Sequence, residues 1–268
     1  MRFFPVCAAL ALVSAPAVPP ATPGLYGSKD WDDGKAELLV YDVIRIYRGD
    51  TLHETATWIT ETGFYAPTSG EFTRKRERDH VEVLQAVLRR PGAAEGLSVS
   101  ALAALQWDRR RPQSRWWQRT SLHGIYGGHW RRLALEDGKL ALRVESTGGE
   151  GARVLQDYKP PLLTEEMLFT HLRNIPQRRG FKEEVWLLDS QLGDRPSYHA
   201  QYAKIEVMQE NVLVRELNAC LVVVARDDGK RHEFWLHRQG LHPVIKARLA
   251  DGSDWTLRTW ERKKYWSF

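Results

Sequence analysis

The chain has 268 residues, of which 43% are hydrophobic, and its 39 Lys and Arg against 34 Asp and Glu give a formal charge of +5. This length suffices for one large domain with a sizeable core. The modest positive charge suits an anionic surface, but it does not indicate nucleic-acid binding.

The first residues resemble a secretory signal peptide. Arg2 is followed by an apolar stretch over 3–13 and by small residues at Ser14, Ala15 and Ala17. The stretch is too short to span a bilayer. We therefore expect residues 1–21 to be cleaved and the rest to be periplasmic or secreted. No later stretch approaches the ~20 apolar residues of a transmembrane helix, so none is expected in the mature chain.

Residues 22–268 are expected to form a single β domain, and its only cysteine is Cys220. An intramolecular disulfide is therefore excluded, although export would permit one. Cys220 lies in the apolar run 220–224 and is interpreted as a small buried residue.

Strand patterns recur along the whole chain. Asp-Gly pairs, which favour tight hairpins, occur at 33–34, 137–138, 228–229 and 251–252. Leu133–Leu135 and Leu140–Leu142 flank one of these pairs and form the clearest local hairpin. Further strands, rich in β-branched and aromatic residues, are predicted at 36–48, 54–62, 79–90, 115–122, 152–158, 182–188, 199–208 and 212–226.

The last third reads as three consecutive antiparallel strands, over 230–237, 243–249 and 254–260. Turns at Gln239-Gly240 and Asp251-Gly252 join them. Alternation predicts that one face carries apolar residues and the other polar residues. The fold class predicted is mainly β, a curved antiparallel sheet or partly open β-barrel.

One helix is predicted from Thr164 to about Asn174. Thr164 is a suitable N-cap, Glu165 and Glu166 suit the positive end, and Pro176 follows the helix. This helix would cover the open side of the sheet. The stiff segment Lys159-Pro160-Pro161 precedes it, so the domain divides into possible halves at 30–158 and 162–268.

No catalytic or metal motif stands out. The sequence lacks a Gly-x-Ser-x-Gly elbow, a His-Glu-x-x-His pair and a phosphate-binding Gly loop. The His residues lack the close spacing with thiols or carboxylates that is typical of zinc sites, and each is interpreted as a polar residue on a strand face. We expect no catalytic residue, no metal, no cofactor and no enzymatic activity.

A ligand-binding site is predicted where unusual residues are densest. Aromatic side chains surround a Gly-rich bend and a basic run lies close by in sequence: Trp107, Arg109, Arg110, Arg111, Trp116, Trp117, Tyr126 and Trp130. Aromatic faces suit lipids, sugars or a partner surface, and an Arg could bind an anionic head. The alternative is that the aromatics are core and that the Arg run is a solvated hairpin loop.

Two stretches, Trp31–Glu37 and Arg262–Phe268, resemble a group of exported bacterial proteins of unknown function. Some members of that group carry the label "septum formation inhibitor Maf". Maf proteins are cytoplasmic nucleotide pyrophosphatases, so a chain that begins with an export signal does not support the label. The segment Ser121–Trp130 also resembles that group, but it has Gly124-Ile125-Tyr126-Gly127 in place of the expected Glu-Trp-Cys-Gly.

The strand layout is also similar to the half-barrels of periplasmic lipoprotein carriers, whose concave apolar face holds acyl chains. The resemblance implies a fold more strongly than a function. The leading hypothesis is a non-enzymatic exported protein that binds a lipid or another apolar ligand on its concave face. The alternatives are a structural or protein-partner module of the cell envelope, an unrecognised enzyme or a sugar-binding module. An unfilled apolar cavity would favour the first, and a sheet filled by its own Trp side chains would favour the partner module.

Overall fold

The computed structural model describes the backbone of residues 35–47, 49–63, 80–90, 99–108, 114–123, 128–136, 139–146, 152–157, 162–188 and 200–264. It describes most side chains within 35–58, 163–187 and 201–263. The described core residues all lie within these last three ranges.

Fifteen strands form one sheet in the order β8-β7-β6-β5-β4-β3-β2-β1-β15-β14-β13-β12-β11-β10-β9. The strands are β1 Lys35–Tyr47, β2 Asp50–Gly63, β3 His80–Arg90, β4 Val99–Asp108, β5 Ser114–His123, β6 Gly128–Glu136, β7 Lys139–Ser146, β8 Ala152–Asp157, β9 Leu162–Thr164, β10 Lys182–Leu188, β11 Ala200–Val214, β12 Leu217–Arg226, β13 Arg231–His237, β14 Val244–Arg248 and β15 Asp254–Lys264. All neighbours pair antiparallel except β9 and β10, which are parallel.

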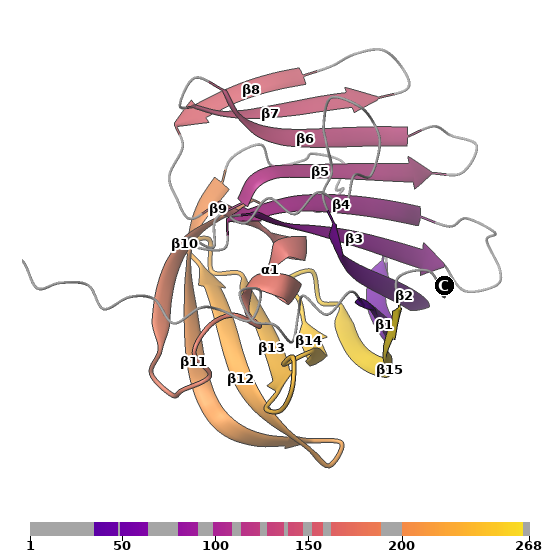
Figure 1. Cartoon of the computed structure of the whole chain (residues 1–268), viewed down its shortest axis with the longest axis vertical. Helices are drawn as coiled ribbons and strands as arrows, with labels where there is room; N and C mark the ends of the chain where they lie inside the picture. Colours follow the sequence, from indigo (N-terminus) through magenta and orange to yellow (C-terminus); the bar gives the residue numbers. More distant parts are fainter. Residues whose placement is uncertain are drawn as a thin grey trace, which may run out of the picture.

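The predicted fold class is confirmed: the protein is mainly β, with a curved antiparallel sheet that is not closed into a barrel. The first and last long strands lie together, since β1 pairs with β2 on one side and with β15 on the other. The sheet curls around a single described helix, α1 (Glu165–His171), which lies on its inner side (Figure 1). The predicted covering helix is therefore present, and it covers the strands on either side of β1.

The helix is shorter than predicted. It ends at His171, and the next residues form tighter turns in which Arg173 N donates to Thr170 O at 3.3 Å and Asn174 N donates to His171 O at 2.9 Å. Such i→i−3 bonds commonly close the last turn of a helix. The prediction of a helix to about Asn174 therefore included this turn segment.

The predicted three-strand meander at the end of the chain is confirmed as β13, β14 and β15. Phe234 and Leu236 are buried, whereas Glu233 and His237 are not. In β14, Val244 and Ile245 are both buried next to a register shift against β13, so strict alternation fails there. A bulge of this kind places two successive residues opposite one on the partner strand.

Two described turns have the predicted Asp-Gly chemistry, because Gly229 and Gly252 have φ of 80° and 81°. The pair Asp33-Gly34 lies outside the described residues. The hairpin predicted around Asp137-Gly138 is present as β6 and β7, in which Glu136 pairs with Lys139.

The long β11–β12 hairpin corrects the predicted strands 199–208 and 212–226. Strand β11 continues to Val214, and the turn is made by Arg215 and Glu216 at φ of 49° and 68°. Neither residue is a usual turn residue at positive φ, where Asn and Gly are preferred. The sequence therefore contained no signal that separates β11 from β12.

Strands β4 and β9 were not predicted. Strand β4, with the sequence VSALAALQWD, contains three alanines and only one β-branched residue, and alanine is depleted in strands. Strand β9 has three residues directly after the segment interpreted as a hinge. Both pair through the backbone with strands that were predicted. Strand β4 pairs with β3 and β5, and β9 pairs with β10.

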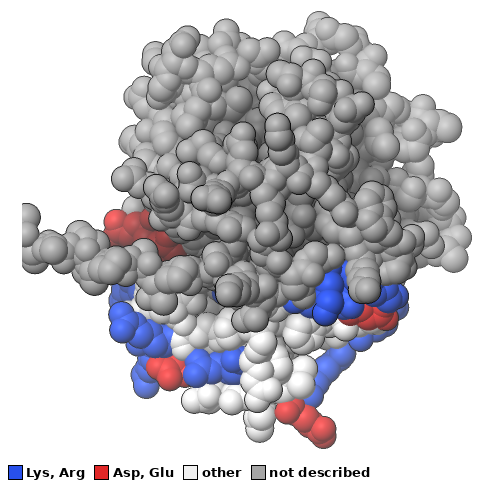
Figure 2. Space-filling view, viewed as in Figure 1, with Lys and Arg blue, Asp and Glu red and all other residues white. Residues whose placement is uncertain are grey.

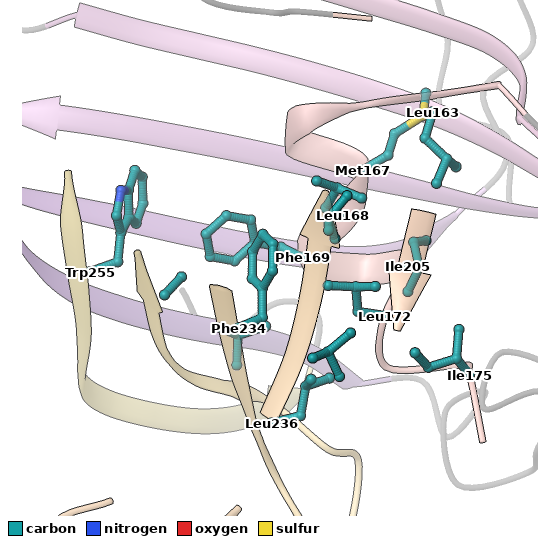
Figure 3. Close-up of a cluster of buried hydrophobic side chains, with 14 of the residues drawn as sticks. Leu163, Met167, Leu168, Phe169, Leu172, Ile175, Ile205, Phe234, Leu236 and Trp255 are labelled. Atoms are coloured by element: carbon teal, nitrogen blue, oxygen red, sulfur yellow. The ribbon is translucent and has the colours of Figure 1, made fainter. Parts of the chain in front are cut away.

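The described core lies between α1 and the inner face of the sheet (Figure 3). Leu163, Met167, Leu168 and Leu172 are completely buried there, together with Phe234 from β13. Cys220 is buried as predicted, and burial raises the pKa of its thiol to about 11.

Candidate functional site

The space between α1 and the sheet is the best-defined site among the described side chains. An isolated helix of seven residues is not stable in water, because helix nucleation is unfavourable. Contacts with the sheet must therefore hold α1 in place. We call this contact region the α1 interface; it has an apolar middle and two polar ends.

Aromatic rings dominate the apolar middle. The ring of Phe169 stacks on Trp58 with centroids 4.6 Å apart, and it meets Phe234 edge to face at 5.4 Å. Trp255 is 5.3 Å from the same ring. Edge-to-face and offset contacts of this kind add stability beyond area burial. Phe169 is thus the centre of an aromatic cluster that joins α1 to β2, β13 and β15.

Tyr41 supports this cluster from β1. Its ring lies 5.9 Å from Phe169 and 5.8 Å from Trp255, and its hydroxyl donates to the carbonyl oxygen of Val244 at 2.8 Å. Burial raises the pKa of Tyr41 well above its ordinary value, since the phenolate would lose its hydration. Tyr41 is therefore a neutral donor at every physiological pH.

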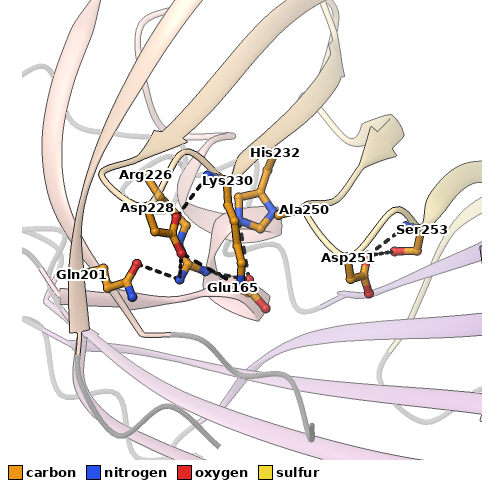
Figure 4. Close-up of polar contacts among 9 residues, drawn as sticks. All are labelled: Glu165, Gln201, Arg226, Asp228, Lys230, His232, Ala250, Asp251 and Ser253. Atoms are coloured by element: carbon orange, nitrogen blue, oxygen red, sulfur yellow. Dashed lines mark hydrogen bonds and ion pairs between the residues drawn. The ribbon is translucent and has the colours of Figure 1, made fainter. Parts of the chain in front are cut away.

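At the N-terminal end of α1, buried charges connect the helix to β12 and β13 (Figure 4). Glu165 Oε1 lies 3.6 Å from Arg226 Nη1 and 3.5 Å from His232 Nε2. Arg226 Nη2 also donates to Asp228 and to Gln201, each at 2.9 Å. The helix start is thus bound to the ends of two strands by one carboxylate.

The tautomer of His232 follows from its second contact. The backbone N–H of Ala250 points at His232 Nδ1, 3.3 Å away, so this nitrogen accepts. A neutral ring then carries its proton on Nε2, which faces Glu165. His232 is completely buried, which places it on the inner face with Phe234 and Leu236.

At the other end of α1, two further pairs of side chains, His171–Glu183 and Arg173–Glu37, connect the helix region to the sheet. His171 Nε2 lies 2.9 Å from Glu183 Oε2 on β10. Burial alone would raise the pKa of Glu183, but the charge and hydrogen bond of His171 outweigh it, so the pKa lies below its ordinary value.

The pair between Arg173 and Glu37 is the most buried of these pairs. Arg173 donates from Nη1 and Nη2 to the two carboxylate oxygens of Glu37, at 2.6 and 2.9 Å, and from Nε to the carbonyl oxygen of Leu241 at 2.8 Å. Trp260 Nε1 donates to the same carboxylate at 2.9 Å. Because Arg173 directly follows the helix turn, this bidentate pair joins α1 to β1 and β15.

The predicted ligand residues lie elsewhere in the sheet, and their side chains are not among those described. The backbone register places Trp116 beside Gln106 and Ala134, and Trp117 beside Leu105 and Leu133. Trp107 pairs with Ser114, and Trp130 pairs with Thr120. Arg109, Arg110, Arg111 and Tyr126 lie outside the described residues. The predicted site therefore stays a prediction.

Sequence reasoning missed the polar ends of the α1 interface. Glu165 was interpreted as a helix-start residue, and His232 as a polar residue on a strand face. One signal was available, because alternation in β13 puts His232 on the same face as Phe234 and Leu236. A histidine on an apolar strand face needs a polar partner, and Glu165 lies close enough to be one.

Within the described part of the chain, no three His, Cys, Asp or Glu side chains gather as a metal site would require. Its helix is not long or apolar enough to cross a membrane. The polar clusters instead consist of Arg-carboxylate and His-carboxylate pairs that bind the helix to the sheet.

Comparison with known proteins supports the fold. Neither a protein-family model nor a curated protein sequence matches the chain. A solved structure does match: the β-barrel-like protein of a domain of unknown function, DUF1849, from Brucella abortus. The likeness covers 86% of this chain and 98% of that one, with a TM-score of 0.53 and 12% sequence identity. At this identity the likeness shows a shared β-barrel-like fold and nothing finer.

Proposed function

We propose that the chain is an exported, non-enzymatic protein of the cell envelope that binds a long apolar ligand beneath α1. One observation carries the proposal: a helix too short to be stable alone covers the inner face of the strands around β1, where side chains are described. When such a helix moves, the face beneath it exposes the apolar side chains of Tyr41, Trp58, Phe234 and Trp255. An acyl chain is the kind of molecule that could cover this apolar face in place of α1.

The energetics bound the size of the ligand. Removing Met167, Leu168, Phe169 and Leu172 from the core costs about 1.5–3 kcal/mol per side chain, or roughly 6–12 kcal/mol in all. A buried methylene returns about 0.8 kcal/mol. A chain of roughly 8–15 methylenes would therefore be needed to offset the displaced helix.

Binding of a fluorescent fatty acid with a chain of this length tests the proposal. Phe169→Ala removes the central ring that competes with the ligand, so we expect it to bind the fatty acid at least tenfold more tightly than the wild type. Trp186→Ala is a matched control, because Trp186 packs against the core from β10 rather than from α1. Unchanged binding by Phe169→Ala in a folded protein would contradict the proposal.

A second candidate is a structural or protein-partner module of the envelope. The filled inner face favours it, since Trp58, Phe169 and Trp255 already occupy the space beneath the sheet. A partner module would show no affinity for fatty acids of any length, in the wild type or in Phe169→Ala.

A further inference from the structure

The tip of the β11–β12 hairpin, residues 212–218, extends beyond the core. Inner-face residues Ala203, Ile205 and Val207 are buried in the first part of β11, whereas Leu213 near its end is 78% exposed. Leu217, across the turn, is 43% exposed. In Figure 1 the far end of the hairpin lies at the bottom of the view, below β13, β14 and β15.

Apolar side chains occupy both faces of this tip. Val214 pairs with Leu217, and Leu213 pairs with Asn218. Directly opposed residues share a face and successive residues alternate, so Val214 and Leu217 share one face while Leu213 lies on the other. A rigid, flat protein surface would contact only one face of such a ribbon.

Exposed arginines lie in the turn of the hairpin and beside its base. Arg215 is in the turn itself. Arg238 lies at the base of the hairpin, where its backbone N donates to the carbonyl of Asn218 at 3.0 Å, but its guanidinium is partly buried and donates to the carbonyl of Gln177. Arg178 and Arg179 are exposed beside the hairpin, where Gly180 N donates to Val207 O at 3.0 Å. Against the three exposed arginines, Arg178, Arg179 and Arg215, are Glu210 and Glu216, so the local excess is one positive charge (3 − 2). Figure 2 shows Lys and Arg, uncharged side chains and some Asp and Glu over the lower part of the molecule.

We propose that this tip docks on the surface of an anionic phospholipid bilayer. A lipid interface surrounds an inserted ribbon, so it can take Leu213 and Leu217 together although they lie on opposite faces. The ribbon therefore lies along the membrane interface, so that Leu213 and Leu217 reach the acyl boundary while the charged apex, Arg215 and Glu216, stays at the hydrated headgroup level. The arginines then pair with lipid phosphates. This surface is distinct from the α1 interface, and the proposal does not depend on the ligand.

Flotation with vesicles tests the proposal on the full mature chain. We expect binding to phosphatidylcholine vesicles that contain about one third phosphatidylglycerol, weaker binding to pure phosphatidylcholine, and loss of binding as salt rises. Leu213→Ser/Leu217→Ser should lower the partition coefficient about tenfold. Ile46→Ser is the matched control, because Ile46 is 66% exposed but lies on β1, and it should bind as the wild type does.

A second measurement does not depend on these losses. Leu213→Cys can be labelled with a polarity-sensitive dye while Cys220 stays unlabelled, because Cys220 is buried and its thiol has a pKa of about 11. A blue shift with anionic vesicles is expected. The proposal is overturned if the dye does not respond, if both vesicle types bind equally, or if Ile46→Ser loses as much binding as the tip variant.

Discussion

Arg173 makes the most buried charged contacts in the described part of the protein, with Glu37 and with the carbonyl of Leu241. A buried ion pair contributes little compared with apolar residues of the same shape, but breaking it leaves an uncompensated charge. The pair therefore acts as a positional constraint. It fixes where the chain leaves α1 relative to the strands β1 and β15.

The first prediction concerns this pair. Arg173→Met should lower the free energy of unfolding by about 3–5 kcal/mol, because Glu37 stays buried without its main partner. The double variant Arg173→Met/Glu37→Leu should recover most of this loss. Urea unfolding measures both. Equal losses in the single and double variants would show that packing around Arg173, rather than its charge, stabilises this end of the helix.

The second prediction concerns acid stability. The folded pKa of Glu183 lies below its ordinary value of 4.5 because of His171, so the unfolded chain binds the proton more readily. The contribution of Glu183 is therefore fully present above about pH 4.5 and is lost as the pH falls through the lower folded pKa. Glu183→Gln should flatten this part of the stability curve, measured by thermal unfolding between about pH 5 and about pH 3. A curve parallel to that of the wild type would contradict the assignment.

At the scale of the element, the β11–β12 turn conflicts with local preference. Two successive residues at positive φ, Arg215 and Glu216, stand where Asn-Gly would be favoured. Left-handed conformations cost L-residues roughly 1 kcal/mol each. Arg215 and Glu216 are unfavourable at positive φ, so their presence in the turn suggests that their charges have a role. Contact with a bilayer, as proposed above, is such a role.

The third prediction follows from this strain. Arg215→Asn/Glu216→Gly should raise the free energy of unfolding by about 1 kcal/mol, because Gly and Asn adopt positive φ at lower cost. Arg215→Asn alone should bind anionic vesicles less tightly, because it removes one positive charge from the tip and leaves Glu216 in place. Unchanged vesicle binding by Arg215→Asn would mean that Arg215 takes no part in docking.

Elements with strong local signals were the ones that could be predicted from the sequence. Period-two alternation identified β13, and Asp-Gly pairs identified the turns at Gly229 and Gly252. Strand β4 was missed because its alanines have no strand preference and pairing with β3 and β5 decides its conformation. The α1 interface could not be derived, because Glu165 and His232 are far apart in sequence and only the folded sheet brings them together.

At the scale of the whole molecule, one sheet of 15 strands encloses one described helix. The inner face around β1 and β15 is already filled, so a ligand would have to take the place of α1 rather than enter an empty space. The proposed ligand would thus exchange with a part of the protein itself. The DUF1849 structure resembles this chain in its fold, and the likeness extends no further.

The fourth prediction concerns export. The Arg2 start, the apolar stretch over 3–13 and the small residues that follow predict cleavage. N-terminal sequencing of the secreted or periplasmic protein should begin between Pro16 and Gly24. Intact Met1 on protein recovered from the cytoplasm would contradict the proposed location.

Native mass spectrometry of the protein isolated from the cell envelope under mild conditions tests the binding of an apolar ligand beneath α1 most directly. The account predicts a non-covalent adduct with the mass of a long-chain amphiphile, and it predicts that Phe169→Ala carries the same adduct at higher occupancy. The bare mass of the mature chain alone, in both the wild type and a folded Phe169→Ala variant, would contradict it.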